Sequence, residues 1–152
     1  MRETSATARI DAAPLAVWDL YADVSRAPDW VPFVEEVVYL SGPPGLGQVY
    51  RERTRLGGMT DLAEWRVIEW DPPRRQVQLS TDKRMDSRLV IEVEPAGRGC
   101  RIRQKALLES RLPRPLNWAH ELVFAVASRH GIRQAVRAAK AYLERPPAGD
   151  AE

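Results

Sequence analysis

Three side chains of the 152-residue sequence are candidates for proton transfer: Tyr50, Asp61 and Glu69. They fall in stretches where polar and apolar residues alternate. Asp61 and Glu69 share parity with Trp65 and Val67, which predicts that they lie on the apolar face of one strand. A carboxyl group lowered into an apolar cavity acquires a raised pKa and can act as a general acid or base. The alternative is that these acids lie at strand rims in water, and the sequence leaves both open.

Other kinds of chemistry find no support in the residue pattern. The two histidines, His120 and His130, do not have the spacing of a zinc-binding His-Glu-x-x-His helix. No glycine-rich phosphate loop and no Gly-x-Ser-x-Gly nucleophile motif occurs. Cys100 is the single cysteine, so neither a disulfide framework nor a thiolate metal cluster is expected. We therefore expect no metal and no cofactor.

Composition and charge indicate an ordinary globular domain. The sequence is 44% hydrophobic and 29% charged, and 23 basic residues against 21 acidic ones give a net charge of +2. Such a balance does not favour nucleic acid as a partner. We expect one domain over residues 1–152 with a polar tail at 146–152, as a monomer or homodimer. No stretch approaches the ~18 apolar residues of a membrane helix and no apolar signal core is present, so we expect a cytoplasmic protein.

Two hydrophobic periods divide the chain into elements. Alternation with period two predicts strands at 4–10, 34–40, 48–56, 59–70, 75–81, 87–94 and 100–108. Pro14 opens a first helix and Ser25 a second, short one, whereas 115 to about 145 forms a long C-terminal helix. Turn sequences separate the strands, among them Gly57-Gly58. Consecutive hairpins with one polar and one apolar face are typical of an antiparallel sheet that exposes one face to solvent and buries the other.

The C-terminal helix has the apolar stripe needed to cover the apolar face of this sheet. Its predicted inward residues recur at helical spacing: Trp118, Leu122, Ala125, Ile132, Val136, Ala139 and Leu143. Inward positions of the last two strands include Leu89, Ile91 and Val93, followed by Cys100, Ile102, Gln104 and Ala106.

Three segments of the chain resemble motifs of the START-like (SRPBCC) superfamily, and closest among its members are polyketide cyclase/dehydrase-like proteins. They are Ile10-Asp11-Ala12-Ala13-Pro14-Leu15-Ala16-Val17-Trp18, then Pro28-Asp29-Trp30-Val31-Pro32, and Glu69-Trp70-Asp71-Pro72-Pro73-Arg74-Arg75. The resemblance implies an α+β helix-grip fold. In this fold a strongly curved antiparallel sheet of about seven strands wraps a long C-terminal helix, and two short helices follow the first strand. It also implies an internal cavity.

The resemblance favours the binding of a hydrophobic small molecule that is polyketide-, aromatic- or lipid-like. Trp30 and Trp65 match positions where aromatase/cyclase members carry aromatics that face the ligand. The expected cavity residues are Trp30, Phe33, Tyr50, Trp65, Val67, Leu89, Ile91, Trp118 and Leu122. The alternative function is a polyketide cyclase, aromatase or dehydratase that uses cavity acid–base groups. Against it, Glu69 stands where such enzymes tend to place a carbonyl-polarising arginine, and Arg66 has the wrong parity.

A third alternative is an interaction protein that works through a basic outer face. The outward positions of the predicted strands carry Arg51, Arg53, Arg55, Arg101, Arg103 and Lys105. Polar groups that converge inside the cavity would favour an enzyme, and a wholly apolar interior would favour a carrier. A filled core under a positively charged outer face would favour the interaction protein.

Overall fold

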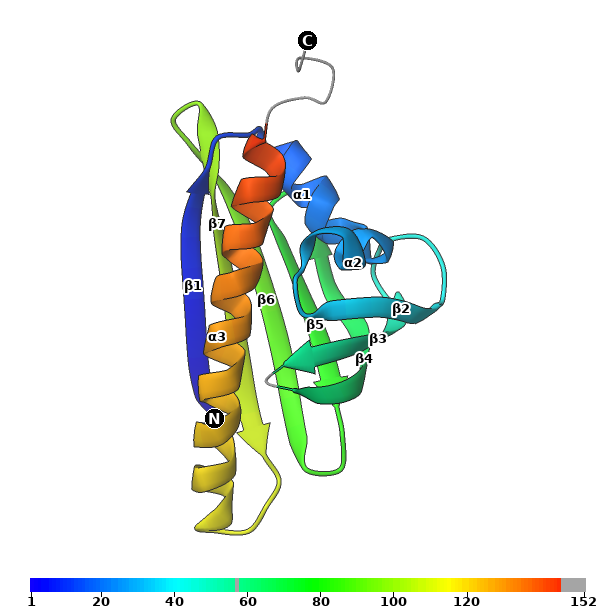
Figure 1. The fold of residues 1–152 in the computed structure, drawn as a ribbon, viewed down its shortest axis with the longest axis vertical. Coiled ribbons are helices and arrows are strands. Elements are labelled where there is room, and N and C mark those ends of the chain that lie inside the picture. The colour runs from blue at the N-terminus through cyan, green and yellow to red at the C-terminus, as the bar shows by residue number, and fades with distance from the viewer. Residues whose placement is uncertain (57, 146–152) are drawn as a thin grey trace.

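The computed structural model describes residues 1–56 and 58–145, which form one curved sheet, a long helix and a cluster of short helices (Figure 1). The strands are β1 (Arg2–Ile10), β2 (Val34–Leu40), β3 (Val49–Leu56), β4 (Met59–Asp71), β5 (Arg75–Thr81), β6 (Met85–Ala96) and β7 (Gly99–Ser110). The helices are α1 (Pro14–Ala22), α2 (Ala27–Trp30) and α3 (Leu116–Glu144), with a 3₁₀ turn at Val24–Arg26. The predicted strands are all present, with ends that differ by a few residues. The predicted tail at 146–152 and Gly57 lie outside the described residues.

The sheet is antiparallel, in the order β1-β7-β6-β5-β4-β3-β2. This order follows from consecutive hairpins, with the first strand returning to pair with the last. Helix α3 packs along β1 and β7, while β2, β3 and β4 curl around the other side of the molecule (Figure 1). The curved antiparallel sheet with its long C-terminal helix confirms the predicted helix-grip fold.

The main core lies where α1 and the C-terminal half of α3 cover the sheet. Ile10, Val17, Cys100, Ile102 and Ala139 are fully buried there. The edge of the Trp18 ring packs against Trp70, with ring centroids 5.0 Å apart. The alternation that predicted the inward residues of β6 and β7 is therefore confirmed in this region.

The two short helical segments are fixed by a cap that the sequence analysis assigned to the wrong residue. Asp23, not Ser25, caps the 3₁₀ turn, because its carboxylate accepts hydrogen bonds from the backbone N–H and the hydroxyl of Ser25. Helix α2 then follows directly and places Trp30 over the concave face of the sheet. This arrangement leaves a cavity between α2, β2 and the central strands.

Candidate functional site

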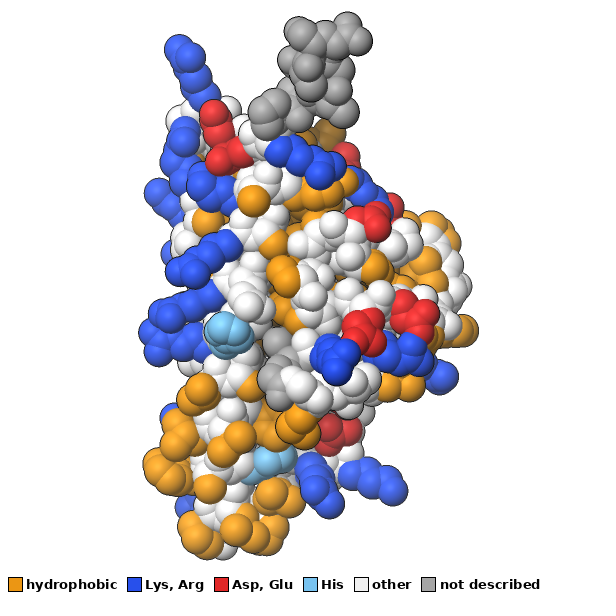
Figure 2. Space-filling view, in the orientation of Figure 1, with side chains coloured by type: hydrophobic (Ala, Val, Ile, Leu, Met, Phe, Trp, Pro, Cys, Tyr) orange, Lys and Arg blue, Asp and Glu red, His pale blue; other side chains and the backbone are white. Residues whose placement is uncertain are grey.

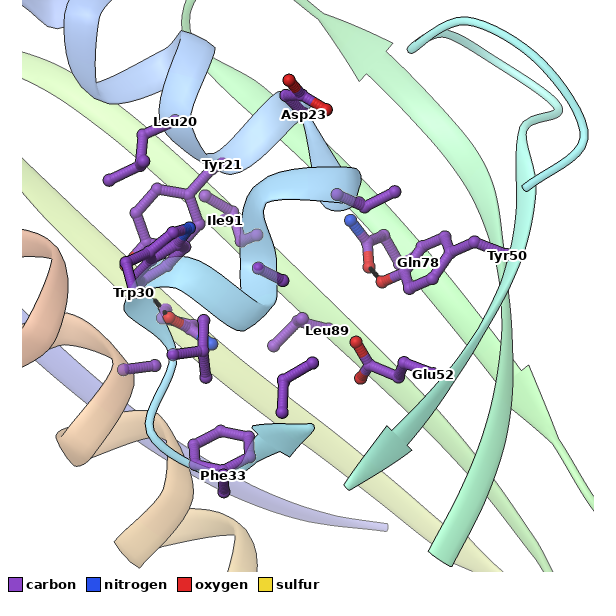
Figure 3. Close-up of a pocket in the computed structure, with 16 residues that line it drawn as sticks. Leu20, Tyr21, Asp23, Trp30, Phe33, Tyr50, Glu52, Gln78, Leu89 and Ile91 are labelled. Atoms are coloured by element: carbon purple, nitrogen blue, oxygen red, sulfur yellow. Dashed lines mark hydrogen bonds between the residues drawn. The ribbon is translucent and has the colours of Figure 1, made fainter. Parts of the chain in front are cut away.

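The cavity has a volume of about 90 Å³ and opens toward solvent. Its walls come from the end of α1, the short helical segments, β2, β3, the central strands and one residue of α3 (Figure 3). The lining residues are Leu20, Tyr21, Asp23, Val24, Ala27, Trp30, Val31, Phe33, Val34, Tyr50, Glu52, Gln78, Leu89, Ile91, Gln104 and Ala135. Most are apolar, and the polar ones come from the end of α1, from Asp23 and from β3, β5 and β7, which are distant in the sequence.

Tyr21 and Trp30 form one aromatic wall of the cavity. Their rings meet edge to face, with centroids 4.9 Å apart. The Tyr21 hydroxyl donates a hydrogen bond to Oε1 of Gln104 at 3.3 Å. Burial raises the pKa of Tyr21 well above its ordinary value, so this phenol is neutral at physiological pH. The indole Nε1 of Trp30 is buried and, within the described part of the chain, has no hydrogen-bond partner.

A chain of buried polar groups forms the opposite wall. The Tyr50 hydroxyl donates to Oε1 of Gln78, and Nε2 of Gln78 donates to Oε1 of Gln76 at 3.0 Å. Tyr50 on β3 and Gln78 on β5 line the cavity, with β4 between the two strands, and the buried Gln76 continues the chain of hydrogen bonds beside them. Burial, reinforced by the charge of Glu52, raises the pKa of Tyr50, so its hydroxyl stays a hydrogen-bond donor.

The cavity shifts the pKa of the Glu52 carboxyl group toward neutral pH. Figure 3 shows its carboxyl group directed into the space beside Leu89 and Tyr50. Burial raises the pKa of Glu52 from an ordinary value of 4.5 to about 7, and the nearby indole N–H of Trp65 offsets part of that rise. The Trp65 N–H does not reach the geometry of a full hydrogen bond. At neutral pH the carboxyl group therefore exchanges readily between its two protonation states, as a general acid or base must.

Five of the sequence-predicted ligand residues line this cavity: Trp30, Phe33, Tyr50, Leu89 and Ile91. Trp65 and Val67 lie beside it without lining it. Trp65 is directly opposite Tyr50 and Val67 directly opposite Gln78, so both lie on the same face of the sheet as these lining residues and next to them. The inward register on β4 is thus the odd-numbered one up to Val67.

Trp118 and Leu122 were predicted in the cavity, and the structure places them outside it. Trp118 is 62% exposed and Leu122 38% exposed. Glu121 and Ala125 take the inward positions on this part of α3. The Glu121 carboxylate accepts the backbone N–H of Ser110 at 3.0 Å and pairs with the N-terminal amine, so a polar contact sets the rotation of the helix here.

Asp61 and Glu69 also lie outside the cavity. Asp61 is exposed near the start of β4. A β-bulge between Val67 and Glu69 reverses the parity of the strand, so Glu69 points to the outer face and accepts a hydrogen bond from Arg75 at 3.0 Å. The same bulge turns Trp70 inward onto Trp18. The parity argument for Glu69 was wrong because alternation cannot reveal an inserted residue.

Glu52, Gln78 and Gln104 line the cavity although they were not among the expected cavity residues. Glu52 shares parity with Tyr50 on an alternating strand, and Gln104 was expected at an inward position of the last strand, so the alternation indicated the face of both. Gln78 gave no signal of this kind. Arg66, the residue nearest to the expected carbonyl-polarising position, is exposed, and no arginine or lysine is among the described residues that line the cavity.

The proposed basic outer face is largely neutralised by neighbouring acids. Arg51 pairs with Glu64, Arg53 with Glu36, Arg55 with Glu35, Arg101 with Glu94 and Lys105 with Glu92. Cross-strand ion pairs of this kind are what a solvated sheet face carries. Nowhere in residues 1–56 and 58–145 do three metal-ligating side chains come together. Across the same residues, no helix is both long enough and apolar enough to span a membrane.

Comparison with known proteins places the chain in a family. Residues 1–144 match the family described as "Polyketide cyclase / dehydrase and lipid transport", and the chain belongs to it. A search of curated protein sequences found no match.

Several solved structures share the fold. The Zhui aromatase/cyclase from Streptomyces sp. R1128 is 17% identical, with 98% of both chains covered and a TM-score of 0.82. A START superfamily protein from Mycobacterium smegmatis is 14% identical, with 93% of this chain and 97% of that chain covered and a TM-score of 0.75. The di-domain aromatase/cyclase BexL of the BE-7585A biosynthetic pathway is 22% identical, with 96% of this chain and 51% of that chain covered and a TM-score of 0.75. At these identities the likeness establishes the fold.

Proposed function

We propose that the protein binds a hydrophobic, oxygen-bearing small molecule of polyketide-like, aromatic or lipid-like character in the cavity. The observation that carries this proposal is the lining itself. Apolar and aromatic walls surround a few polar groups, which is the composition of small-molecule sites. The buried Nε1 of Trp30 has no partner within the described residues, and a ligand carbonyl or hydroxyl would satisfy this donor.

The cavity is too small for a polycyclic ligand unless its walls move. Its volume of about 90 Å³ is below the roughly 300–1,000 Å³ of drug-sized ligand sites. A polycyclic ligand therefore needs the cavity to widen. Two of its walls are suited to move: α2 is only four residues long, and β2 is an edge strand whose pairing with β3 contains register shifts.

A second candidate function is acid–base catalysis on the bound molecule, of the cyclase or dehydratase kind. Glu52 supports it, because a carboxyl group with a pKa of about 7 inside a ligand cavity can both accept and return a proton. Tyr50 and Gln78 would hold a substrate oxygen by hydrogen bonding. With no cationic side chain in the described lining, such catalysis would rest on positioning and proton transfer.

Native mass spectrometry of freshly purified protein, followed by organic extraction, tests the binding proposal. We expect an added mass that is lost on denaturation. Leu89→Trp should reduce it, because the larger ring occupies the cavity, whereas the matched change Leu62→Trp, at an exposed site outside the cavity, should retain it. Equal retention by both variants, or no bound mass together with no displacement of a hydrophobic dye, would refute the proposal.

Mass analysis of the extracted compound after incubation separates carrier from enzyme. A carrier returns the compound unchanged. A dehydratase, or a cyclase that also dehydrates its product, returns a product lighter by one water from wild-type protein, whereas a cyclase without dehydration returns an isomer of equal mass that is recognised by its chromatographic retention. Glu52→Gln returns the unchanged compound in both cases. Conversion at the same rate by wild type and Glu52→Gln would exclude Glu52 as the acid–base group. Cytoplasmic location and a monomeric or homodimeric state remain predictions from the sequence.

A further inference from the structure

The N-terminal half of α3 exposes large apolar side chains on several sides at once. We call this region the apolar tip; its residues are Leu116, Trp118, Leu122, Val123, Phe124 and Val126, between 38% and 66% exposed. Figure 2 shows hydrophobic side chains gathered over this end of the helix. Single exposed apolar residues are ordinary, but a contiguous exposed group of this kind marks an interaction site. The cavity does not account for it, because none of the six residues lines it.

A row of arginines continues from the apolar tip on the side of the helix that Leu122 and Val126 occupy. Arg129, Arg133 and Arg137 follow Val126 at steps of three and four residues, and we call them the basic stripe. All three are exposed, and among the salt bridges of the described residues none involves them. Figure 2 shows this run of basic side chains next to the orange end of α3.

Helix α3 carries only two acidic residues, and both face other groups of the protein. Glu121 is buried and accepts the backbone N–H of Ser110. Glu144 accepts hydrogen bonds from Lys140 and from the backbone N–H of Asp11. The outward face of α3 is therefore apolar at one end and positive along the rest. The balanced net charge of the whole chain conceals this local separation.

A groove beside the basic stripe offers room for an anion. It lies between the edge strand β1 and α3 and is lined by Ser5, Ala6, Thr7, Ala8, Arg133, Val136 and Arg137. Two guanidinium groups next to an open strand edge suit a phosphate oxygen, which accepts charge-assisted hydrogen bonds.

These features fit one kind of partner. A second copy of the chain could cover the apolar tip, but a symmetric pair would leave both basic stripes without counter-charge. Nucleic acid would match the arginines and leave the apolar side chains exposed. We propose that the outward face of α3 docks on an anionic lipid bilayer, with the apolar tip in the acyl boundary and the basic stripe on lipid phosphates. Trp118 in the tip fits this arrangement, because tryptophan favours the membrane interface. This inference does not depend on what the cavity holds.

Vesicle flotation with the full-length protein tests the docking. We expect binding to vesicles of phosphatidylcholine mixed with phosphatidylglycerol, little binding to phosphatidylcholine alone, and weaker binding as salt is raised. Arg133→Gln/Arg137→Gln should lower the partition coefficient about 25-fold, since each basic residue near an anionic surface contributes about five-fold. Trp118→Ala/Phe124→Ala should weaken binding at every salt concentration, because it removes the inserted apolar groups.

The matched control is Arg101→Gln/Arg103→Gln, which removes the same charge from exposed positions on the outer face of β7, the side of the sheet opposite α3. This control should bind vesicles as wild type does, and equal thermal melting of all variants would show that they are folded. If the control and the basic-stripe variant lose vesicle binding to the same extent, net charge alone explains the binding and the proposal is overturned. Binding that ignores lipid charge would also overturn it. So would a wild-type dimer in sedimentation that Trp118→Ala/Phe124→Ala dissociates, because the tip would then be covered by a second copy.

Discussion

Glu52→Gln is expected to remove a pH dependence of stability that comes from the cavity. The pKa of Glu52 rises from 4.5 to about 7 on folding, because burial disfavours the charged carboxylate. Between these two values the folded protein binds more protons than the unfolded chain, so the free energy of unfolding falls as the pH rises. The stabilising protonated form is fully present below pH 4.5, and the cost of ionisation is fully present above about pH 7.

The magnitude follows from the size of the pKa change. A rise from 4.5 to about 7 corresponds to about 3 kcal/mol at roughly 1.36 kcal/mol per unit. Glu52 keeps partial contact with water, which reduces the expected difference to about 2 kcal/mol. Glutamine is neutral at every pH and has nearly the same shape. Glu52→Gln should therefore match wild type at acidic pH and be about 2 kcal/mol more stable above neutral pH.

Urea unfolding followed by tryptophan fluorescence at a series of pH values measures this difference. The control is Asp61→Asn, which removes a carboxylate from the same sheet face at an exposed position outside the cavity. It should show the pH profile of wild type. A stability difference between Glu52→Gln and wild type that stays constant with pH would refute the reasoning, as would a Glu52→Gln protein that is less stable at alkaline pH.

Three further substitutions test the architecture around the site. Gly99→Ala should destabilise by about 1–3 kcal/mol in urea unfolding, because its Cβ would stand 2.2 Å from the carbonyl oxygen of Ile10, a backbone atom that cannot turn away. Asp23→Ala should cost about 1 kcal/mol in the same assay through loss of the cap on the 3₁₀ turn, and a change under a few tenths would contradict that role. Trp30→Ala should reduce retention of any bound compound in native mass spectrometry, since it removes an aromatic wall and the free indole N–H; unchanged retention would exclude Trp30 from the site.

The sequence predicted the strands and the main core well because both depend on local alternation. On β7 every second residue from Cys100 to Leu108 is buried, and on β6 the inward Ile91 and Val93 are buried as the pattern predicts. The C-terminal half of α3 behaves in the same way, with Val136 in the core. These elements are long, regular and covered on one face, so the periodicity of the sequence is also the periodicity of burial.

Prediction of the site was less complete because the site depends on departures from regularity. The bulge on β4 turned Glu69 outward, and the hydrogen bond of Glu121 to Ser110 turned Leu122 away from the sheet. Neither event has a signature in the alternation of residue types. Trp30 and Tyr50, by contrast, line the cavity, since regular local structure or a family motif fixes their positions.

The sequence by itself determined the order of the strands and helices, the dry face of the sheet and the family, because these follow from patterns between near neighbours in the chain. Only the tertiary structure decided which side chains share the cavity. Its walls come from α2, β3, β5 and β6, which meet through the curvature of the sheet. It also decided the proton affinity of Glu52 and the exposure of the apolar tip. Both depend on how much water distant elements exclude, and the free energy of a charge or an apolar group is set by that contact with water.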